Sequence, residues 1–233
     1  MIWNEAIDYP IKYMSFQTKT KSHGLALIEV LVVMSIVICL AVLISNTLRK
    51  KKYATAVAAL ECIDNLKQTG LGLTLYAQDN NGKFPLQIVV TNSGIARPIY
   101  PNHAFPCYQV ASNELGNYPK ILICPFDITR QAAASFEMLS ETNVSYLFNA
   151  DAVRDSSTNS ILSGDRFLEC DGHPVNSGLF ILTTNLNMSW TPSLHRGDGN
   201  VTWSDGSVQQ TTSAGLHSIV QNQFLATNHF LIP

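Results

Sequence analysis

The residues with the clearest potential for chemistry lie near the C-terminus, in the segment LHRGDGNVTWSDGSVQ. His195 exchanges protons near neutral pH, and with Asp198 or Asp205 and one of many serines it would suit a hydrolase. The oxygen atoms of Asp198, Asn200 and Asp205 would also suit calcium. Neither chemistry is favoured, because the chain lacks a G-x-S-x-G, an H-E-x-x-H, a phosphate-binding glycine loop and the EF-hand spacing. We therefore expect no catalytic residue, no metal and no cofactor.

The same segment is typical of a β-hairpin. The runs NVTW and SVQQ flank Ser204 to Gly206, and Asp-Gly between alternating runs favours a turn that needs positive φ. Asp165 in SGDR and the pair Asp171–Gly172 are likewise predicted to form turns.

The cysteines show none of the paired short spacings of a zinc ribbon. They are Cys39, Cys62, Cys107, Cys124 and Cys170. Cys39 lies in an apolar run, which leaves four that would suit up to two disulfides outside the cytoplasm, in three possible connectivities, or four separate buried residues. One specific hypothesis is a bridge from Cys62, on a predicted helix, to Cys124 in ILICP.

The composition narrows the class of protein. The chain has 233 residues, 46% hydrophobic and only 14% charged, whereas charged residues normally make up about 25% of a soluble globular chain. This leaves room for one domain plus a lipid-contacting segment, and it argues against disorder and against a multidomain enzyme. Residues 53–233 carry 14 acidic and 8 basic side chains, so we expect no nucleic-acid partner.

The lipid-contacting segment is Leu25 to Ser45, 21 residues with one charge, which matches the thickness of a bilayer as a helix. A cleaved secretory signal is the alternative, but its apolar region is usually shorter, and here the four basic residues Arg49 to Lys52 follow closely. The one charge is Glu29, which would cost about 2 to 3 kcal/mol if it faced lipid. It either extends to the membrane surface or pairs with a cation from another molecule at the same depth.

The residues around Glu29 carry a family resemblance. KSHG followed by LALIEVLVVMSIV resembles the N-terminus of type IV pilins and of the pseudopilins of type II secretion systems. The resemblance implies cleavage after Gly24 by a prepilin peptidase, methylation of the new N-terminal residue Leu25, and a role for Glu29 in assembly. A start at Met14 would give an 11-residue basic leader. The segment NLKQTGLGLTLYAQDNNGKFP and the H-x9-DG motif formed by His195, Asp205 and Gly206 are similar to those of many pilin-like proteins.

The elements that position these residues are a long helix and a loop-rich β domain. The helix is predicted from Leu25 to about Asp79, ended by Asn80, Asn81, Gly82 and Pro85, with Gly70 and Gly72 marking a place where the domain approaches closely. Its outer half has apolar residues at spacings of three or four: Ala56, Leu60, Ile63, Leu66 and Leu73. Short apolar runs then predict strands: IVV at 88–90, ILI at 121–123, SYLF at 145–148, SIL at 160–162 and GLFIL at 178–182.

Together these features predict an α+β, pilin-like fold: a leader at 1–24, a membrane helix at 25–48, its amphipathic continuation at 49–82, and a β head at 83–233. The resemblance implies a non-enzymatic, single-pass pseudopilin of the bacterial inner membrane. Its leader would be cytoplasmic, its head periplasmic, and it would assemble into a secretion pseudopilus or type IV pilus-like fibre. The implied partners are prepilin peptidase, like subunits, an inner-membrane assembly platform and lipid. The alternatives are a signal-anchored extracytoplasmic binding module and, less favoured, a membrane-anchored hydrolase.

Overall fold

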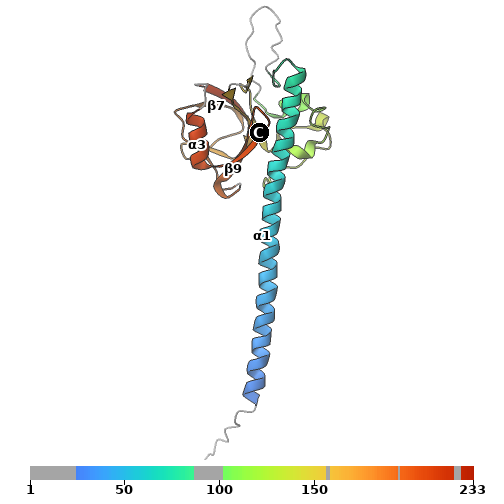
Figure 1. Ribbon diagram of the computed structural model, residues 1–233, viewed down its shortest axis with the longest axis vertical. Helices are drawn as coiled ribbons and strands as arrows, with labels where there is room; N and C mark the ends of the chain where they lie inside the picture. Colours follow the sequence, from blue (N-terminus) through green and yellow to red (C-terminus); the bar gives the residue numbers. More distant parts are fainter. Residues whose placement is uncertain (1–24, 87–101, 156–157, 194, 223–226) are drawn as a thin grey trace, which may run out of the picture. The chain divides into compact units, whose positions relative to one another are not determined.

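The computed structural model describes residues 25–86, 102–155, 158–193, 195–222 and 227–233, shown as ribbons in Figure 1. The chain divides into two units, Met1–Lys51 and Lys52–Pro233. Helix α1, Leu25–Asp79, begins in the first unit and ends in the second. An antiparallel β domain follows it, which confirms the predicted α+β class. The leader at 1–24 and the strand predicted at 88–90 lie outside the described residues.

The first unit is described from Leu25 and consists of apolar helix. An 18-residue window of α1 has a mean hydropathy of 3.1, and none of that window is buried within the protein. The core helix of a soluble protein would bury most of such a surface. By its length and composition, the helix is apolar enough to cross a bilayer once. The same length and composition also fit an N-terminal signal sequence.

The C-terminal end of α1 follows from local backbone chemistry. Asn81 and Gly82 adopt left-handed φ values of 56° and 78°. The amide of Gly82 donates to the carbonyl oxygen of Ala77 at 2.7 Å, the bond that closes a Schellman-type cap. The predicted stop signal is confirmed, with the last helical residue at Asp79.

A six-stranded antiparallel sheet forms the centre of the second unit, in the order β10-β9-β4-β1-β11-β7. Its strands are β1 (Tyr146–Asn149), β4 (Ile161–Asp165), β7 (Gly178–Thr183), β9 (Asp198–Trp203), β10 (Val208–Thr212) and β11 (Thr227–Ile232). A three-stranded sheet contains β6 (His173–Pro174), β5 (Leu168–Cys170) and β8 (Met188–Trp190), and a pair contains β2 (Arg154–Asp155) and β3 (Thr158–Asn159). The short helices are α2 (Phe105–Val110), α3 (Ser213–Gln221), and the 3-10 turns η1 (Pro119–Leu122), η2 (Phe136–Met138), η3 (Glu141–Asn143) and η4 (His195–Gly197).

Alternating side chains of the large sheet enter two separate cores. On β1, Tyr146 and Phe148 join a core that includes residues of α1, whereas Leu147 joins a core with α3 and β8. Successive side chains of a strand point to opposite faces, so the sheet is covered on both sides. This explains why every residue of β1 is buried, and it confirms the strand predicted at 145–148.

The other strand predictions have mixed outcomes. The strands at 160–162 and 178–182 are confirmed as β4 and β7. The strand predicted at 121–123 is wrong, because this segment is the turn η1 followed by one extended residue, Ile123. Pro119 begins that turn, and Ile121 and Leu122 are buried within it. Their apolar character therefore reflects burial in the core and not strand pairing.

The face of α1 that packs on the head is shifted from the predicted one. Leu66 and Leu73 are fully buried as expected. Ala56 and Leu60 are exposed, however, and Leu60 keeps 67% of its accessible surface. The buried stripe begins only at Cys62, six residues after Ala56, the first residue of the predicted apolar face.

Candidate functional site

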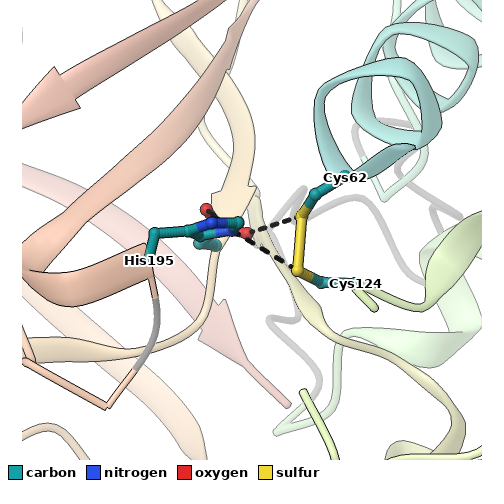
Figure 2. A group of neighbouring side chains, drawn as sticks. Cys62, Cys124 and His195 are labelled. Atoms are coloured by element: carbon teal, nitrogen blue, oxygen red, sulfur yellow. Dashed lines mark hydrogen bonds and ion pairs between the residues drawn. A yellow bond between two sulfur atoms is a disulfide. The ribbon is translucent and has the colours of Figure 1, made fainter. Parts of the chain in front are cut away.

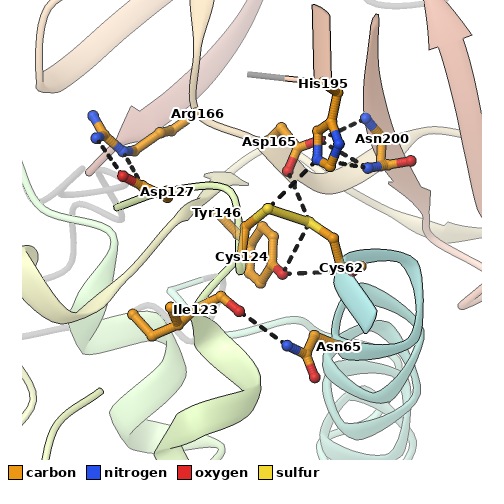
Figure 3. Close-up of a disulfide and its surroundings, with 10 residues drawn as sticks. All are labelled: Cys62, Asn65, Ile123, Cys124, Asp127, Tyr146, Asp165, Arg166, His195 and Asn200. Carbon is orange, nitrogen blue, oxygen red and sulfur yellow. Dashed lines mark hydrogen bonds and ion pairs between the residues drawn. A yellow bond between two sulfur atoms is a disulfide. The ribbon is translucent and has the colours of Figure 1, made fainter. Parts of the chain in front are cut away.

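The candidate site is built around a disulfide between α1 and the head. Cys62 lies on α1 and Cys124 follows η1, and the structure joins their sulfur atoms across a sequence separation of 62 residues. The two Cα atoms are 4.9 Å apart, within the normal range for a disulfide. Beside the bridge, Asn65 Nδ2 donates to the carbonyl oxygen of Ile123 at 2.9 Å, as Figure 3 shows. This is the cysteine pair that the sequence analysis singled out.

The remaining cysteines are not bridged in the structure. Cys107 is a free, buried thiol, Cys170 is free and half-buried, and Cys39 is free and exposed on α1. Of the two disulfides that the cysteine count would allow, the structure contains one.

His195 lies directly against this disulfide. It begins the turn η4 with a left-handed φ of 46°, and its side chain is only 3% exposed. Its Nε2 atom is 3.4 Å from Cys124 Sγ, as Figure 2 shows. The ring of Phe126 packs edge-on against the imidazole, with 4.6 Å between the centroids. Burial lowers the pKa of His195, and Asp198 acts in the opposite direction, so the neutral imidazole is favoured.

Asp165 completes the site, and its predicted place in a turn is wrong. It is the last residue of β4, with a fully buried side chain. Its Oδ2 atom accepts hydrogen bonds from the amide and the Nδ2 of Asn200, at 2.8 and 3.0 Å. The same oxygen is 3.5 Å from His195 Nε2. Burial raises the pKa of Asp165 to about 7, although the two Asn200 bonds act to lower it.

The Asp165 carboxylate also faces the other half of the disulfide. Its Oδ1 atom lies 3.7 Å from Cys62 Sγ. Tyr146 approaches the same sulfur from the side, with its hydroxyl 3.6 Å away. A disulfide sulfur has no proton to donate, so the Cys62–Asp165 approach is a contact and becomes a hydrogen bond only when Cys62 is a thiol.

The neighbouring carboxylate of Asp127 has a different environment. Arg166 binds it through two nitrogens, with Nε 2.8 Å from Oδ2 and Nη2 3.1 Å from Oδ1, as Figure 3 shows. Burial alone would raise the pKa of Asp127, but the hydrogen bonds from Arg166 and Thr129 outweigh it and lower the pKa. The guanidinium is therefore committed to Asp127, although Arg166 is next to Asp165 in the sequence.

The geometry around His195 differs from that of a catalytic triad. In a triad the nucleophile contacts one ring nitrogen and the carboxylate contacts the other. Here Cys124 Sγ and Asp165 Oδ2 both approach Nε2. The imidazole therefore cannot accept a proton from one group at Nε2 while the other orients it at Nδ1, so the arrangement suits shared binding of a single positive centre better than nucleophilic catalysis.

The other end of the H-x9-DG motif has a structural role. Asp205 Oδ1 accepts a hydrogen bond from the amide of Ser207 at 2.8 Å, and Gly206 has a φ of 85°, so the predicted hairpin between β9 and β10 is confirmed. The turn rests on α1, where a β-carbon at Gly70 would lie 3.4 Å from the carbonyl oxygen of Gly206. Gly72 is similarly close to the head, which confirms that both helix glycines mark a close approach of the backbone.

The residues that the resemblance assigned to processing and assembly are not part of this site. Gly24 lies outside the described residues. Leu25 is the first residue of α1, and Glu29 lies on α1 with an exposed side chain. Both belong to the first unit.

Sequence reasoning missed two members of the site, Asp165 and Asn200. Asp165 was assigned to a turn, and Asn200 was considered only as a calcium ligand, whereas its amide group is bonded to Asp165. A signal was present in the pattern ILSGDR, because an acidic residue that ends an apolar run is a candidate buried carboxylate. Gly164, the residue before Asp165, is a second signal. A β-carbon there would lie 2.8 Å from the carbonyl oxygen of Asn200, so glycine allows β4 and β9 to approach closely at this point.

Comparisons with models of known protein families, with curated proteins and with solved structures found no match. The fold therefore defines the class of this protein: an α+β chain with one long N-terminal apolar helix, disulfide-bonded to an antiparallel β domain.

Proposed function

We propose that the chain is a pilin-like subunit, of the pseudopilin type, that prepilin peptidase processes and that assembles with like subunits into a secretion pseudopilus or type IV pilus-like fibre. The proposal gives it a structural role and no catalysis. Its head would be periplasmic, and its membrane helix would lie in the bacterial inner membrane until an assembly platform extracts it.

The observation that carries the proposal is the position of Glu29. It is exposed on an apolar helix whose neighbouring side chains, such as Ile28 and Val32, are exposed as well. Within a bilayer this carboxylate would cost about 2 to 3 kcal/mol without a partner. Cleavage after Gly24 creates an α-amino group at Leu25, and the same group on a neighbouring subunit is the partner we propose.

The helix segment in the second unit supports lateral packing. Tyr53, Val57 and Leu60 are large apolar residues at spacings of four and three, and all are at least 61% exposed. Residues at these spacings share one helix face. Exposed contiguous apolar surface of this kind is typical of a protein contact, and the apolar helix of a second copy would cover it.

The first test is the mature N-terminus. Protein extracted from the membrane should have a mass that begins at Leu25 and includes one methyl group. A mature protein that retains residues before Leu25 would contradict the processing step, and with it the amino group on which assembly depends.

The second test is the Glu29→Ala variant, with Ser35→Ala as the matched control on the same helix. Ser35 Oγ donates to the carbonyl oxygen of Val32, so its loss removes a polar group but no charge. Breaking one partner of a buried ion pair costs about 3 to 5 kcal/mol. Glu29→Ala should insert into the membrane normally but lose the ladder of self-adducts after crosslinking, and the control should keep it. A ladder in both variants would refute the role of Glu29, and no ladder in the native protein would favour a monomeric binding module.

A further inference from the structure

Four electron-rich atoms converge at the disulfide. They are Cys62 Sγ, Cys124 Sγ, an oxygen of Asp165 and His195 Nε2, and all lie within 4.8 Å of one another. The residues come from α1, the segment after η1, β4 and η4, so the fold brings them together from four distant parts of the sequence.

Three distances among these residues fall within the range of a tetrahedral zinc site, two of them measured to different oxygens of Asp165. With Zn–S bonds of about 2.3 Å and Zn–N or Zn–O bonds of about 2.0 to 2.1 Å, ligand atoms lie about 3.3 to 3.8 Å from one another. Cys124 Sγ is 3.4 Å from His195 Nε2, which is 3.5 Å from Asp165 Oδ2. Asp165 Oδ1 is 3.7 Å from Cys62 Sγ. The sulfur pair is closer than a metal site requires, because the two sulfurs are bonded, and the remaining two pairs lie within 4.8 Å.

Asn200 orients one of the ligands, Asp165, as outer-sphere groups of metal sites do. Its Nδ2 donates to Asp165 Oδ2, which fixes the direction of the amide group. The same Nδ2 is 3.4 Å from His195 Nε2. Since an amide nitrogen only donates, a hydrogen bond at this distance uses the single lone pair of an unprotonated Nε2, which is the lone pair that a metal would take. Nε2 is also 3.5 Å from Asp165 Oδ2, so a cation bound between these two atoms would take the lone pair of Nε2 in place of Asn200.

We propose that this cluster is a redox-dependent zinc site, in which the reduced protein binds one Zn²⁺ through Cys62, Cys124, His195 and Asp165. The disulfide and the metal are alternative states of one site. When the sulfurs are bonded they lack the negative charge that zinc requires, and when zinc is bound they are protected from oxidation. Two thiolates, one imidazole and one carboxylate form a ligand set that zinc accepts.

Conversion between the states balances as follows. One thiol of a dithiol reductant attacks one sulfur of the bridge, which breaks the Cys62–Cys124 bond and forms a mixed disulfide. The second thiol of the reductant then attacks this mixed disulfide and frees the protein thiol. Two electrons and two protons pass to Cys62 and Cys124, and the reductant leaves as its own disulfide. Zn²⁺ then displaces both thiol protons to solvent as it binds the thiolates.

The test uses the full chain in detergent, reduced with dithiothreitol and desalted under nitrogen, with Co²⁺ as a spectroscopic probe. The reduced protein should give a thiolate-to-cobalt charge-transfer band and intense tetrahedral d–d bands, which one equivalent of Zn²⁺ abolishes. The oxidised protein should give neither. An equal spectrum from the oxidised protein, or no tetrahedral spectrum from the reduced one, would overturn the proposal.

Variants identify the ligands. Cys124→Ser should lose the tetrahedral spectrum, and Asp165→Asn should weaken cobalt binding more than about tenfold, since each removes a ligand. Cys170→Ser is the matched control, because Cys170 is a free cysteine outside the cluster, and it should bind cobalt as the native chain does. If Cys170→Ser weakened binding as much as Cys124→Ser, the assignment would be wrong. A zinc-dependent rise in Tm of the reduced native protein, absent after oxidation, tests the same site without any variant.

Discussion

Replacing both cysteines of the bridge, as Cys62→Ala with Cys124→Ala, should destabilise the second unit by more than the loss of two buried sulfurs. The bridge closes a sequence separation of 62 residues. In the chain-entropy description, a loop of this size restricts the unfolded state by about 4 kcal/mol at 25 °C. Each buried sulfur that is removed adds about 1 kcal/mol for lost packing. We therefore expect a total loss of about 6 kcal/mol in the free energy of unfolding.

Urea unfolding followed by tryptophan fluorescence measures this loss, since Trp190 and Trp203 both lie in the second unit. A chelator must be present so that no metal stabilises either protein. Cys107→Ala is the matched control, because Cys107 is fully buried and free, and it should lose only about 1 kcal/mol. If the double variant lost no more than twice as much as this control, the cross-link would contribute nothing and the reasoning would be refuted.

Two further predictions concern packing and pH. Gly72→Ala should destabilise by about 1 to 3 kcal/mol despite the better helix propensity of alanine: its β-carbon would lie 2.9 Å from the carbonyl oxygen of Glu114. Gln78→Ala, at an exposed position of α1, should change urea stability by less than about 0.5 kcal/mol, and an equal effect of both would contradict the packing argument. Arg166→Met should destabilise by about 3 kcal/mol at pH 7, because it leaves the buried carboxylate of Asp127 unpaired. The folded state has the lower pKa for Asp127, so this contribution is present above the unfolded pKa of about 3.9 and is lost as pH falls through the folded pKa. Stability curves of the two proteins should therefore converge in acid, and a constant difference down to about pH 2 would contradict this reasoning.

The sequence predicted best those features that depend on neighbouring residues. The end of α1 at Asp79 and the turn at Gly206 follow from left-handed backbone that only a few residue types adopt readily. The strand that failed, at 121–123, shows the limit of this approach, because a short apolar run is equally compatible with a buried turn.

The site itself was only partly predictable. His195 and the two cysteines were identified as separate features, but their meeting depends on which face of α1 packs on the sheet. That face begins at Cys62 and not at Ala56. Its position depends on the packing of the whole core and cannot be read from the helix periodicity. The pattern ILSGDR marks Asp165 as a candidate buried carboxylate, but its partner Asn200 could not be predicted because it lies on β9, which is remote in the chain.

The two ends of the H-x9-DG motif lie near different turns of α1. His195 touches the disulfide that contains Cys62, and Gly206 rests on Gly70, eight residues further along the helix. Strand β9 therefore works as a spacer of fixed length between two attachment points. Removing one residue from it would detach one end, and it would also turn every later side chain of the strand to the wrong face. The nine residues between His195 and Asp205 thus set the distance between these two attachment points.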